Sequence, residues 1–377
     1  MPTPSEFTEL QCARPPSDPV SSLAFYRDAE SRRAAHLLVA SWDKVIKATH
    51  LPQTVQLQDW SRCAAGPDEV TVLQTFTHPA AVLDVCWIDE TFAASACLDR
   101  RVRLLNLDSG QMMIMGKHEQ GICRVRYDAN TRLLVSASWD SSLKVWDPHT
   151  DSDSRLLHTI SLPAKAFAMD IVPTYLNAES VPVQDTTPRM VVAMAERLVY
   201  IYNLQSIRDA CDRRDFDQAS QAEQTRESSL KFMLRDIRCM PDGLGYTTSS
   251  IEGRIAVEFF DPSTESQAQK YAFKCHRKEV DGEDVVFPIH AVAFSPRYGT
   301  FATGGGDAHC ALWDPFAKKR IRQYALPASI SALAFSADGH MLAIATGADD
   351  LNQDLKPGDV EITMKPVIQD AKPKTKK

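Results

Sequence analysis

Apolar and polar residues alternate with a period of two through most of the chain, in short runs that end at small residues or at an acidic residue. Such alternation is typical of half-buried β-strands, whereas an amphipathic helix repeats its apolar residues every three to four positions. Glycine, proline and aspartate separate the runs, as turns require. The pattern therefore predicts an all-β chain of many short strands.

The same group of strands recurs along the sequence. Six copies share an apolar run, a small-residue break, an acidic turn residue and an alternating strand, and the acidic residues lie 41 to 56 positions apart. These residues are Asp43, Asp99, Asp140, Glu196, Glu252 and Asp307, and a seventh copy begins at Ile330. Because a WD40 blade needs about 40 to 45 residues, the spacing predicts a seven-bladed WD40 β-propeller with longer connections between most blades.

The two ends of the chain can complete one blade together. The last copy supplies a third strand in "DVEITMKPV", and "EFTELQCA" near the N-terminus is a strand without a partner in its own copy. Joining them removes an open sheet edge. We expect a single propeller over residues 1–365, closed by the N-terminal strand, and a disordered basic tail over residues 366–377. The polar insertions 173–188 and 209–225 are expected to be solvated loops.

The copy "SASWDSSLKVWDP" contains two tryptophans with different expected roles. His118, Asp140 and Trp146 are residue types of the hydrogen-bonded network that supports a WD repeat, because a buried indole and a buried imidazole each need a partner. Trp139 lies beside the turn aspartate, which places it at the rim of one face, and Trp42 has the same position in the first copy. Exposed tryptophans favour partner binding, and packing against an adjoining loop is the alternative.

Composition narrows the possible function classes. The 377 residues are 44% hydrophobic and carry a net charge of −7, so a buried core is expected and direct nucleic-acid binding is not. No apolar run is long enough for a membrane helix, and the N-terminus lacks the features of a secretory signal. Nine scattered cysteines without a C-x-x-C pair favour reduced thiols and no metal site. We find no catalytic motif, and expect neither an enzyme nor a cofactor.

One part of the repeat is rich in cations. "SIEGR" leaves Arg254 at a hairpin tip, and the next strand, "YAFKCHR", places Lys274 on the face opposite Tyr271 and Phe273 and on the same face as His276. If the two strands are neighbours, Arg254 and Lys274 can converge on one anion. Converging cations on an acidic protein favour a phosphopeptide or an acidic peptide, and ordinary solvated side chains are the alternative. Arg235, Arg238 and Lys231 are expected to add to the positive field.

Several longer stretches resemble one family. "RESSLK", "SSIEGR", "YAFKCHR", "FATGGGD", "WDPFAKKR" and "LAFSADG" are similar to the Bub3 family of spindle-assembly-checkpoint WD40 proteins, and the similarity runs from about Ser5 to Thr346. The resemblance implies a monomeric, non-enzymatic scaffold of the nucleus and of the mitotic kinetochore, with the cytoplasm as a second location. It implies binding of a GLEBS segment in the Bub kinase and its Mad relative across the top face. It also implies reading of phosphothreonine in Met-Glu-Leu-Thr repeats of a kinetochore scaffold.

The resemblance also assigns residues. Arg254 and Lys274 match the family's phosphothreonine-binding positions, and Arg235 matches an arginine that pairs with acidic residues of GLEBS. Trp42 and Trp139 match the two family tryptophans of the "SWD" motifs. The segment after Ile344, "ATGADDLNQDLKPGD", departs from the family, so contacts from the seventh blade are not carried over.

Other functions remain open at this point. The related messenger-RNA export WD40 factor binds a nucleoporin GLEBS segment and shares "SIEGR" and a "KCHR" element. An adaptor that binds without dependence on phosphate is a further alternative. A propeller enzyme with a site in the central channel lacks support from any motif.

Overall fold

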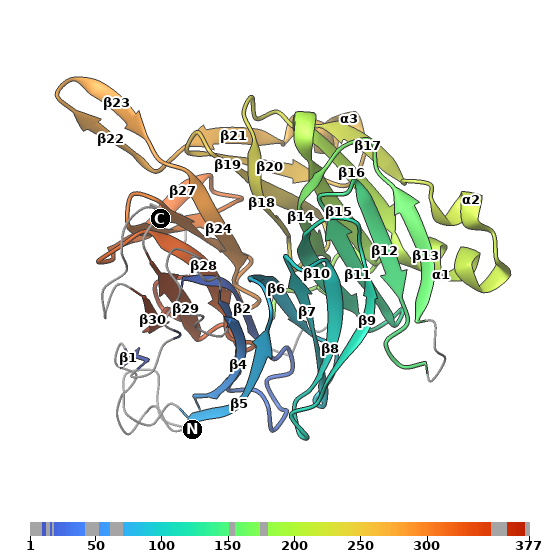
Figure 1. The fold of residues 1–377 in the computed structure, drawn as a ribbon. Coiled ribbons are helices and arrows are strands. Elements are labelled where there is room, and N and C mark those ends of the chain that lie inside the picture. Colours follow the sequence, from blue (N-terminus) through green and yellow to red (C-terminus); the bar gives the residue numbers. More distant parts are fainter. Residues whose placement is uncertain are drawn as a thin grey trace.

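The computed structural model describes residues 10–12, 16, 19–41, 53–60, 71–150, 155–173, 180–347 and 360–373. Over these residues the chain forms seven four-stranded antiparallel sheets, and a separate two-stranded hairpin (Figure 1). The innermost strands contact one another in a closed ring, in the order β2, β6, β10, β14, β18, β24, β28 and back to β2. The predicted seven-bladed β-propeller is therefore confirmed.

Each blade runs from an innermost to an outermost strand. The first blade consists of β2 (Val20–Phe25), β3 (His36–Ser41), β4 (Gln53–Asp59) and β5 (Thr71–His78), and the second of β6 (Val82–Trp87), β7 (Phe92–Cys97), β8 (Arg101–Asn106) and β9 (Met112–Lys117). The third blade consists of β10 (Ile122–Asp128), β11 (Leu133–Ser138), β12 (Ser142–Trp146) and β13 (Leu156–Ser161). The fourth consists of β14 (Ala166–Ile171), β15 (Arg189–Met194), β16 (Leu198–Asn203) and β17 (Gln224–Glu227). The fifth blade consists of β18 (Leu234–Cys239), β19 (Gly245–Ser250), β20 (Arg254–Phe259) and β21 (Tyr271–Lys274). The sixth consists of β24 (Ile289–Phe294), β25 (Phe301–Gly305), β26 (His309–Asp314) and β27 (Lys319–Ala325). The seventh consists of β28 (Ile330–Phe335), β29 (Met341–Thr346), β30 (Glu361–Pro366) and β1 (Leu10–Gln11).

The N-terminal strand closes the ring as predicted. β1 pairs with β30, with Leu10 opposite Met364, and the amide of Cys12 donates to the carbonyl of Ile362 at 2.8 Å. The expected boundary at residue 365 lies too early, because Val367 and Ala371 are fully buried. They pack against the sixth and seventh blades, where apolar side chains left in water would be costly. The propeller therefore includes part of the expected tail.

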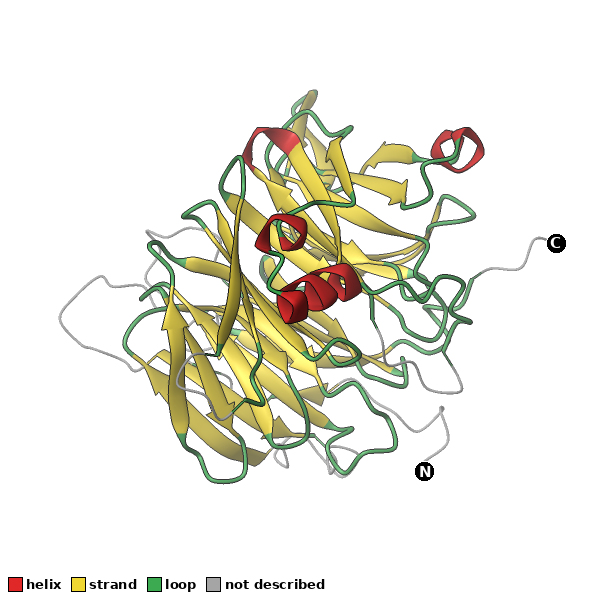
Figure 2. Cartoon of the chain, turned by 90° about the vertical axis from the view of Figure 1, so that its right-hand side faces the viewer, coloured by secondary structure: helices red, strands yellow, loops and turns green. Residues whose placement is uncertain are grey.

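The second polar insertion contains helices rather than a solvated loop. α1 (Leu204–Arg213) is capped by Asn203, whose side chain accepts a hydrogen bond from the amide of Ser206. The helix buries Leu204, Ile207 and Ala210. α2 (Phe216–Ala219) follows and contacts β13 of the neighbouring blade. Figure 2 shows these helices on the outside of the sheets. A short apolar stripe within a polar sequence was enough to stabilise a helix against the blade.

Smaller elements complete the described chain. A 3₁₀ turn (η3, Ala195–Arg197) links β15 to β16, and α3 (Thr264–Ala268) precedes β21. β22 (Arg277–Val280) and β23 (Glu283–Val286) form a hairpin that projects from the disc (Figure 1). The sequence did not predict this hairpin.

The predicted WD network is present in the third blade. The indole Nε1 of Trp146 donates to Ser136 Oγ at 2.9 Å, and His118 Nε2 lies 2.8 Å from the same oxygen. His118 Nδ1 lies 3.0 Å from Asp140 Oδ2. Trp146 is 1% exposed and packs in the core between the second and third blades. The structural role predicted for Trp146 is confirmed.

Some features are absent from the described residues. No helix among them is long and apolar enough to cross a membrane. The same part of the chain contains no cluster of three or more histidine, cysteine, aspartate or glutamate side chains that could hold a metal ion. The eight described cysteines are free thiols.

Candidate functional site

The fifth blade presents the predicted cations along one edge. Arg254 is the first residue of β20 and Lys274 is the last residue of β21, and the two lie directly opposite each other in the antiparallel ladder. Arg235 lies at the same end of the innermost strand β18, next to Leu234, which pairs with Ser250. Since neighbouring strands lie about 5 Å apart, the three cations form a row that runs outward across one blade.

The turn before Arg254 explains why this arrangement is stable. Gly253 has a φ of +64°, and a Cβ atom there would meet the carbonyl oxygen of Cys275 at 2.6 Å. The amide of Cys275 donates to the carbonyl of Gly253 at 2.9 Å. Only glycine fits both the backbone angle and the close approach of the outer strand. The glycine in "EGR" therefore fixes the register that places Arg254 opposite Lys274.

β21 separates an apolar side from a polar side. Phe273 packs on Trp313 of the sixth blade with ring centroids 4.6 Å apart, and Tyr271 stacks beside it. Lys274 is exposed, as the alternation predicts. The expectation that His276 shares a strand face with Lys274 was wrong, because β21 ends at Lys274 and His276 has a φ of +49°. Its ring is buried, with Nδ1 2.8 Å from Asp307 Oδ1, in the network of the sixth blade.

The two paired cations have different surroundings. The side chain of Arg254 is 35% exposed and forms an ion pair with Glu252, Nε to Oε2, at 3.3 Å. Lys274 makes no ion pair with any of the residues that the structure describes. One guanidinium is thus held in place by a carboxylate, while the neighbouring ammonium is left to water. This is an arrangement that can bind an anion without a large rearrangement.

Arg235 lies at the mouth of the central channel. It is exposed, and its Nη2 is 3.1 Å from His290 Nδ1. Both residues line a cavity of about 540 Å³, whose wall is built from the starts of the innermost strands. We call the side of the disc with this cavity and with the β11–β12 and β19–β20 turns the upper face.

Trp139 lies on the same cavity. Its ring is half-buried, packs against the core between the third and fourth blades, and approaches Gly121, where a Cβ atom would come within 3.1 Å. The rest of the indole lines the cavity with Arg235. The indole therefore packs locally and also faces the opening, and partner binding by Trp139 stays a prediction. Trp42 lies outside the described residues.

Three apolar side chains near the cation row were missed at the level of sequence. Phe232, Met233 and Ile251 are 53%, 45% and 38% exposed. The amide of Ile251 donates to the carbonyl of Met233 at 3.1 Å, which holds the β19–β20 turn against the start of β18. Met233 also lines the cavity. The sequence "KFML" before β18 did not indicate that the side chains of Phe232 and Met233 are exposed to solvent.

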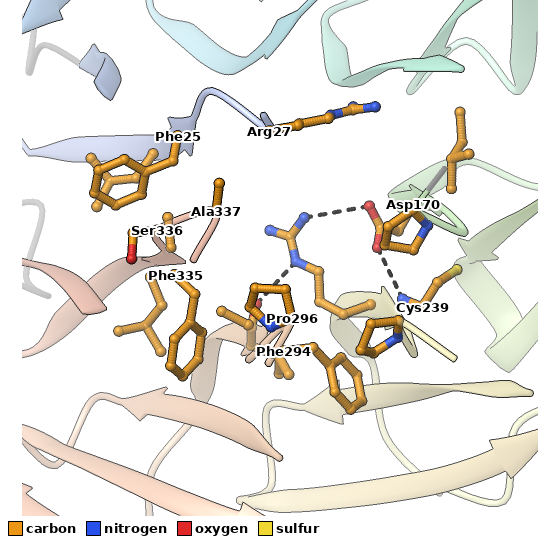
Figure 3. A pocket seen from close by; sticks show the side chains of 18 of the residues that line it. Phe25, Arg27, Asp170, Cys239, Phe294, Pro296, Phe335, Ser336 and Ala337 are labelled. Atoms are coloured by element: carbon orange, nitrogen blue, oxygen red, sulfur yellow. Dashed lines mark hydrogen bonds and ion pairs between the residues drawn. The ribbon is translucent and has the colours of Figure 1, made fainter. Parts of the chain in front are cut away.

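The opposite mouth of the channel has a different character. A cavity of about 250 Å³ is rimmed there by Phe25, Phe294 and Phe335 (Figure 3). Arg238 also lines it, and its Nε donates to the carbonyl of Val292 at 3.0 Å and to Asp236 Oδ2 at 3.2 Å. The expectation that Arg238 adds to the field around Arg254 was wrong. Arg238 lies three residues further along β18 than Arg235, toward the opposite mouth, and the carboxylates of Asp236 and Asp170 neutralise it.

The upper face therefore combines a cation pair, a further arginine, exposed apolar side chains and a half-buried indole. Such a surface can bind an extended chain that carries both anionic and apolar side chains.

Comparison with known proteins identifies the family of the chain. The family model described as "WD domain, G-beta repeat" matches residues 110–147 and 270–314. "Mitotic checkpoint protein BUB3.1" of Arabidopsis thaliana is 40% identical, over 91% of this chain and 88% of that protein. "Mitotic checkpoint protein bub3" of Dictyostelium discoideum is 35% identical over 91% of this chain and 89% of its own length. The chain belongs to the Bub3 family of mitotic checkpoint WD40 proteins.

The two matched repeats of this Bub3-family chain contain the complete networks. The first ends at Asp147 and includes His118 and Trp146, and the second includes His276 and Trp313, whose Nε1 donates to Thr303 Oγ1 at 2.9 Å. A more distant relative, "Poly(A)+ RNA export protein" of Schizosaccharomyces pombe, is 29% identical over 98% of this chain and 94% of its own length.

Proposed function

We propose that this Bub3-family chain is a non-enzymatic spindle-checkpoint scaffold that reads phosphothreonine and holds a GLEBS segment on its upper face. The phosphothreonine belongs to Met-Glu-Leu-Thr repeats of a kinetochore scaffold protein. The GLEBS segment belongs to the Bub kinase and to its Mad relative. By holding both, the propeller recruits the checkpoint proteins to unattached kinetochores. This role requires nuclear entry and kinetochore localisation in mitosis.

The observation that carries the proposal is the direct cross-strand pairing of Arg254 and Lys274. A phosphate monoester has nearly two negative charges and three acceptor oxygens, so two adjacent cations bind it better than they bind a single carboxylate. Phe232 and Ile251 are exposed on the same blade and can cover the apolar Met and Leu side chains that precede the threonine.

Separate residues would hold the GLEBS segment. Arg235 is exposed at the channel mouth and would pair with acidic residues of that segment. The indole of Trp139 offers an apolar surface at the same opening, and Trp42 is proposed for the same role. The phosphopeptide lies farther out on the fifth blade, so both ligands fit on one face without overlap.

The test compares phosphorylated and unphosphorylated forms of one Met-Glu-Leu-Thr peptide by isothermal titration calorimetry. The phosphorylated form is expected to bind at least about 30-fold more tightly, which corresponds to roughly 2 kcal/mol. A peptide with glutamate in place of threonine is the matched control, because it carries one charge without the tetrahedral oxygens. Equal affinity for the phosphorylated and unphosphorylated peptides would exclude phosphothreonine reading and would favour an adaptor that binds without dependence on phosphate.

A second candidate function is supported by the relative named for poly(A)+ RNA export, which covers nearly the whole chain. In that function the upper face would hold a nucleoporin GLEBS segment, and the cation pair would have no phosphothreonine ligand. Binding of the nucleoporin segment together with failure to bind the phosphopeptide would favour this second function.

A further inference from the structure

The outer edge of the second blade differs from that of its neighbours. β9 is the outermost strand there, and no strand pairs with its outer side in the described part of the chain. Three consecutive side chains on it are exposed and apolar, with Met112 40%, Met113 47% and Ile114 55% exposed. An open strand edge of this kind is a template for another strand, and most proteins protect it with charge, proline or a cover.

In the described chain, the outer strands β5, β13, β17, β21 and β27 have no run of exposed large apolar side chains. The exposed positions are polar in β17 (Thr225, Glu227) and mostly charged in β27, and α2 contacts β13. Among the described residues of β5, β13, β17, β21 and β27, only one large apolar side chain is as exposed as Met112 of β9. This residue is Leu73 of β5, which is 41% exposed. The contrast shows that the blade architecture does not require an apolar edge.

The exposed part of β9 also keeps regular strand geometry. Met112, Met113 and Ile114 lie opposite Leu105, Leu104 and Arg103 in unbroken register, and the irregularity in this ladder falls only after Ile114, at Met115. Met115 is buried in the core between the second and third blades, which anchors the strand. Three residues of extended backbone are therefore held ready to pair.

One end of this edge is cationic. Arg101 lies opposite Lys117 in the ladder, and Lys144 reaches the same corner, with its Nζ 2.7 Å from the carbonyl oxygen of Lys117. The carboxylate beside Arg101 is Asp99, which also binds Arg103. The corner thus has an excess of positive charge that favours carboxylates on a partner.

The cationic corner adjoins the upper face. Leu98 lines the central cavity, and it belongs to the same short turn between β7 and β8 as Arg100, just before Arg101. A partner chain that crosses the cavity can therefore pass over this turn and continue along β9.

We infer that β9 binds an extended segment of a partner protein by strand addition, with apolar side chains over residues 112–114 and carboxylates opposite Arg101 and Lys117. Backbone hydrogen bonds along the edge supply affinity, and alternate side chains supply specificity. This inference is independent of the proposed phosphothreonine site, which lies on the fifth blade.

The test selects binders from a displayed library of random peptides of about twelve residues, using the full chain. We expect enriched peptides to alternate apolar residues and to carry aspartate or glutamate near one end. Ile114→Lys is expected to weaken the selected peptides by at least about tenfold, and Lys117→Glu by about fivefold. Leu73→Lys, on the outer strand of the neighbouring blade, is the matched control and should leave affinity unchanged.

Two further measurements address strand addition itself. Hydrogen exchange at those amides of residues 112–114 that point away from β8 should slow when a selected peptide binds. N-methylation of alternate peptide residues should abolish binding. The Arg254→Ala/Lys274→Ala double variant should bind these peptides normally. The inference is overturned if no enriched peptide depends on Ile114, or if N-methylation has no effect. It is also overturned if the unliganded chain dimerises and Ile114→Lys abolishes the dimer, because a second copy would then be the occupant.

Discussion

Arg254 and Lys274 face each other across the β20–β21 ladder, at the end of the fifth blade that carries the Gly253 turn. Strands in a ladder are about 5 Å apart, so their side chains can contact one phosphate from two sides. Glu252 holds Arg254 by an ion pair at 3.3 Å, whereas Lys274 is free to move toward a ligand. The pair thus combines a positioned guanidinium with a flexible ammonium.

Arg254→Ala and Lys274→Ala are each expected to reduce affinity for the phosphorylated Met-Glu-Leu-Thr peptide by about 2 kcal/mol, because each removes a charge-assisted contact. Calorimetric titration measures the change. Lys270→Ala is the control, since Lys270 is exposed at the other end of the same strand region.

The melting temperatures of Lys274→Ala and Lys270→Ala should match the wild type, since both side chains are exposed. Arg254→Ala should melt slightly lower, because the carboxylate of Glu252, whose side chain is 14% exposed, loses its ion-pair partner. If the substitutions weakened the unphosphorylated peptide as much as the phosphorylated one, the cations would be general surface charge and not a phosphate site.

Trp139→Ala is expected to weaken binding of a GLEBS peptide by at least about 2 kcal/mol, as for an aromatic hot spot. Because the indole is half-buried against the core, the variant should also unfold at a slightly lower temperature. Trp146→Phe is the matched comparison, since Trp146 is 1% exposed and should affect stability without affecting affinity. Loss of stability with unchanged GLEBS affinity for Trp139→Ala would assign that indole to local packing alone.

The hydroxyl of Ser136 connects two buried rings, which makes it a sensitive position. It lies 2.9 Å from Trp146 Nε1 and 2.8 Å from His118 Nε2. Ser136→Ala leaves both nitrogens without this partner, and we expect a loss of about 2 to 3 kcal/mol in the free energy of unfolding, measured by urea denaturation.

Thr248→Val is the control for Ser136→Ala. Thr248 is also fully buried, but its Oγ1 has no hydrogen-bond partner among the residues that the structure describes. Replacing its hydroxyl by a methyl group should therefore be neutral or stabilising. Similar losses in the two variants would mean that the cost comes from packing and not from the network around His118.

The sequence predicted those parts of the molecule that depend on local pattern. The strands, the acidic turns and the partnership of β1 with β30 all follow from alternation and turn chemistry. The convergence of Arg254 and Lys274 was predicted only on the condition that their strands are neighbours, because the connection from β20 to β21, which contains α3, does not fix the register. These are relations within one repeat or between neighbouring strands.

The features that sequence could not supply depend on contacts between blades. Arg238 adds little to the positive field because Asp236 and Asp170 form ion pairs with it, the latter 3.7 Å from its Nη1. α1 forms because Ile207 and Ala210 are buried, although most of its sequence is polar. Likewise, the half-buried position of Trp139 depends on Gly121, which belongs to a preceding connection. None of these contacting residues lies at a sequence separation that the repeat pattern fixes.

Stability should fall in mildly acidic solution, because two structural histidines are held neutral. Burial lowers the pKa of His118 to about 4, against the opposing attraction of Asp140, and burial likewise lowers the pKa of His78 to about 4. The unfolded chain binds these protons near pH 6.5, so it holds more protons than the folded chain between pH 6.5 and 4. Their contribution is therefore complete above about pH 6.5 and is lost as the pH falls toward 4.

We expect the free energy of unfolding to decrease by up to roughly 1.4 kcal/mol per pH unit for each histidine in this window, measured by urea denaturation at a series of pH values. His118→Gln should be less stable at pH 7.5 but should show a smaller slope, because one titrating group is gone. The carboxylates contribute in a lower range, since hydrogen bonds keep the pKa of Asp140 below its ordinary value despite burial. An unchanged slope in His118→Gln would show that His118 is not the group that titrates, and that the acid sensitivity of the fold has another source.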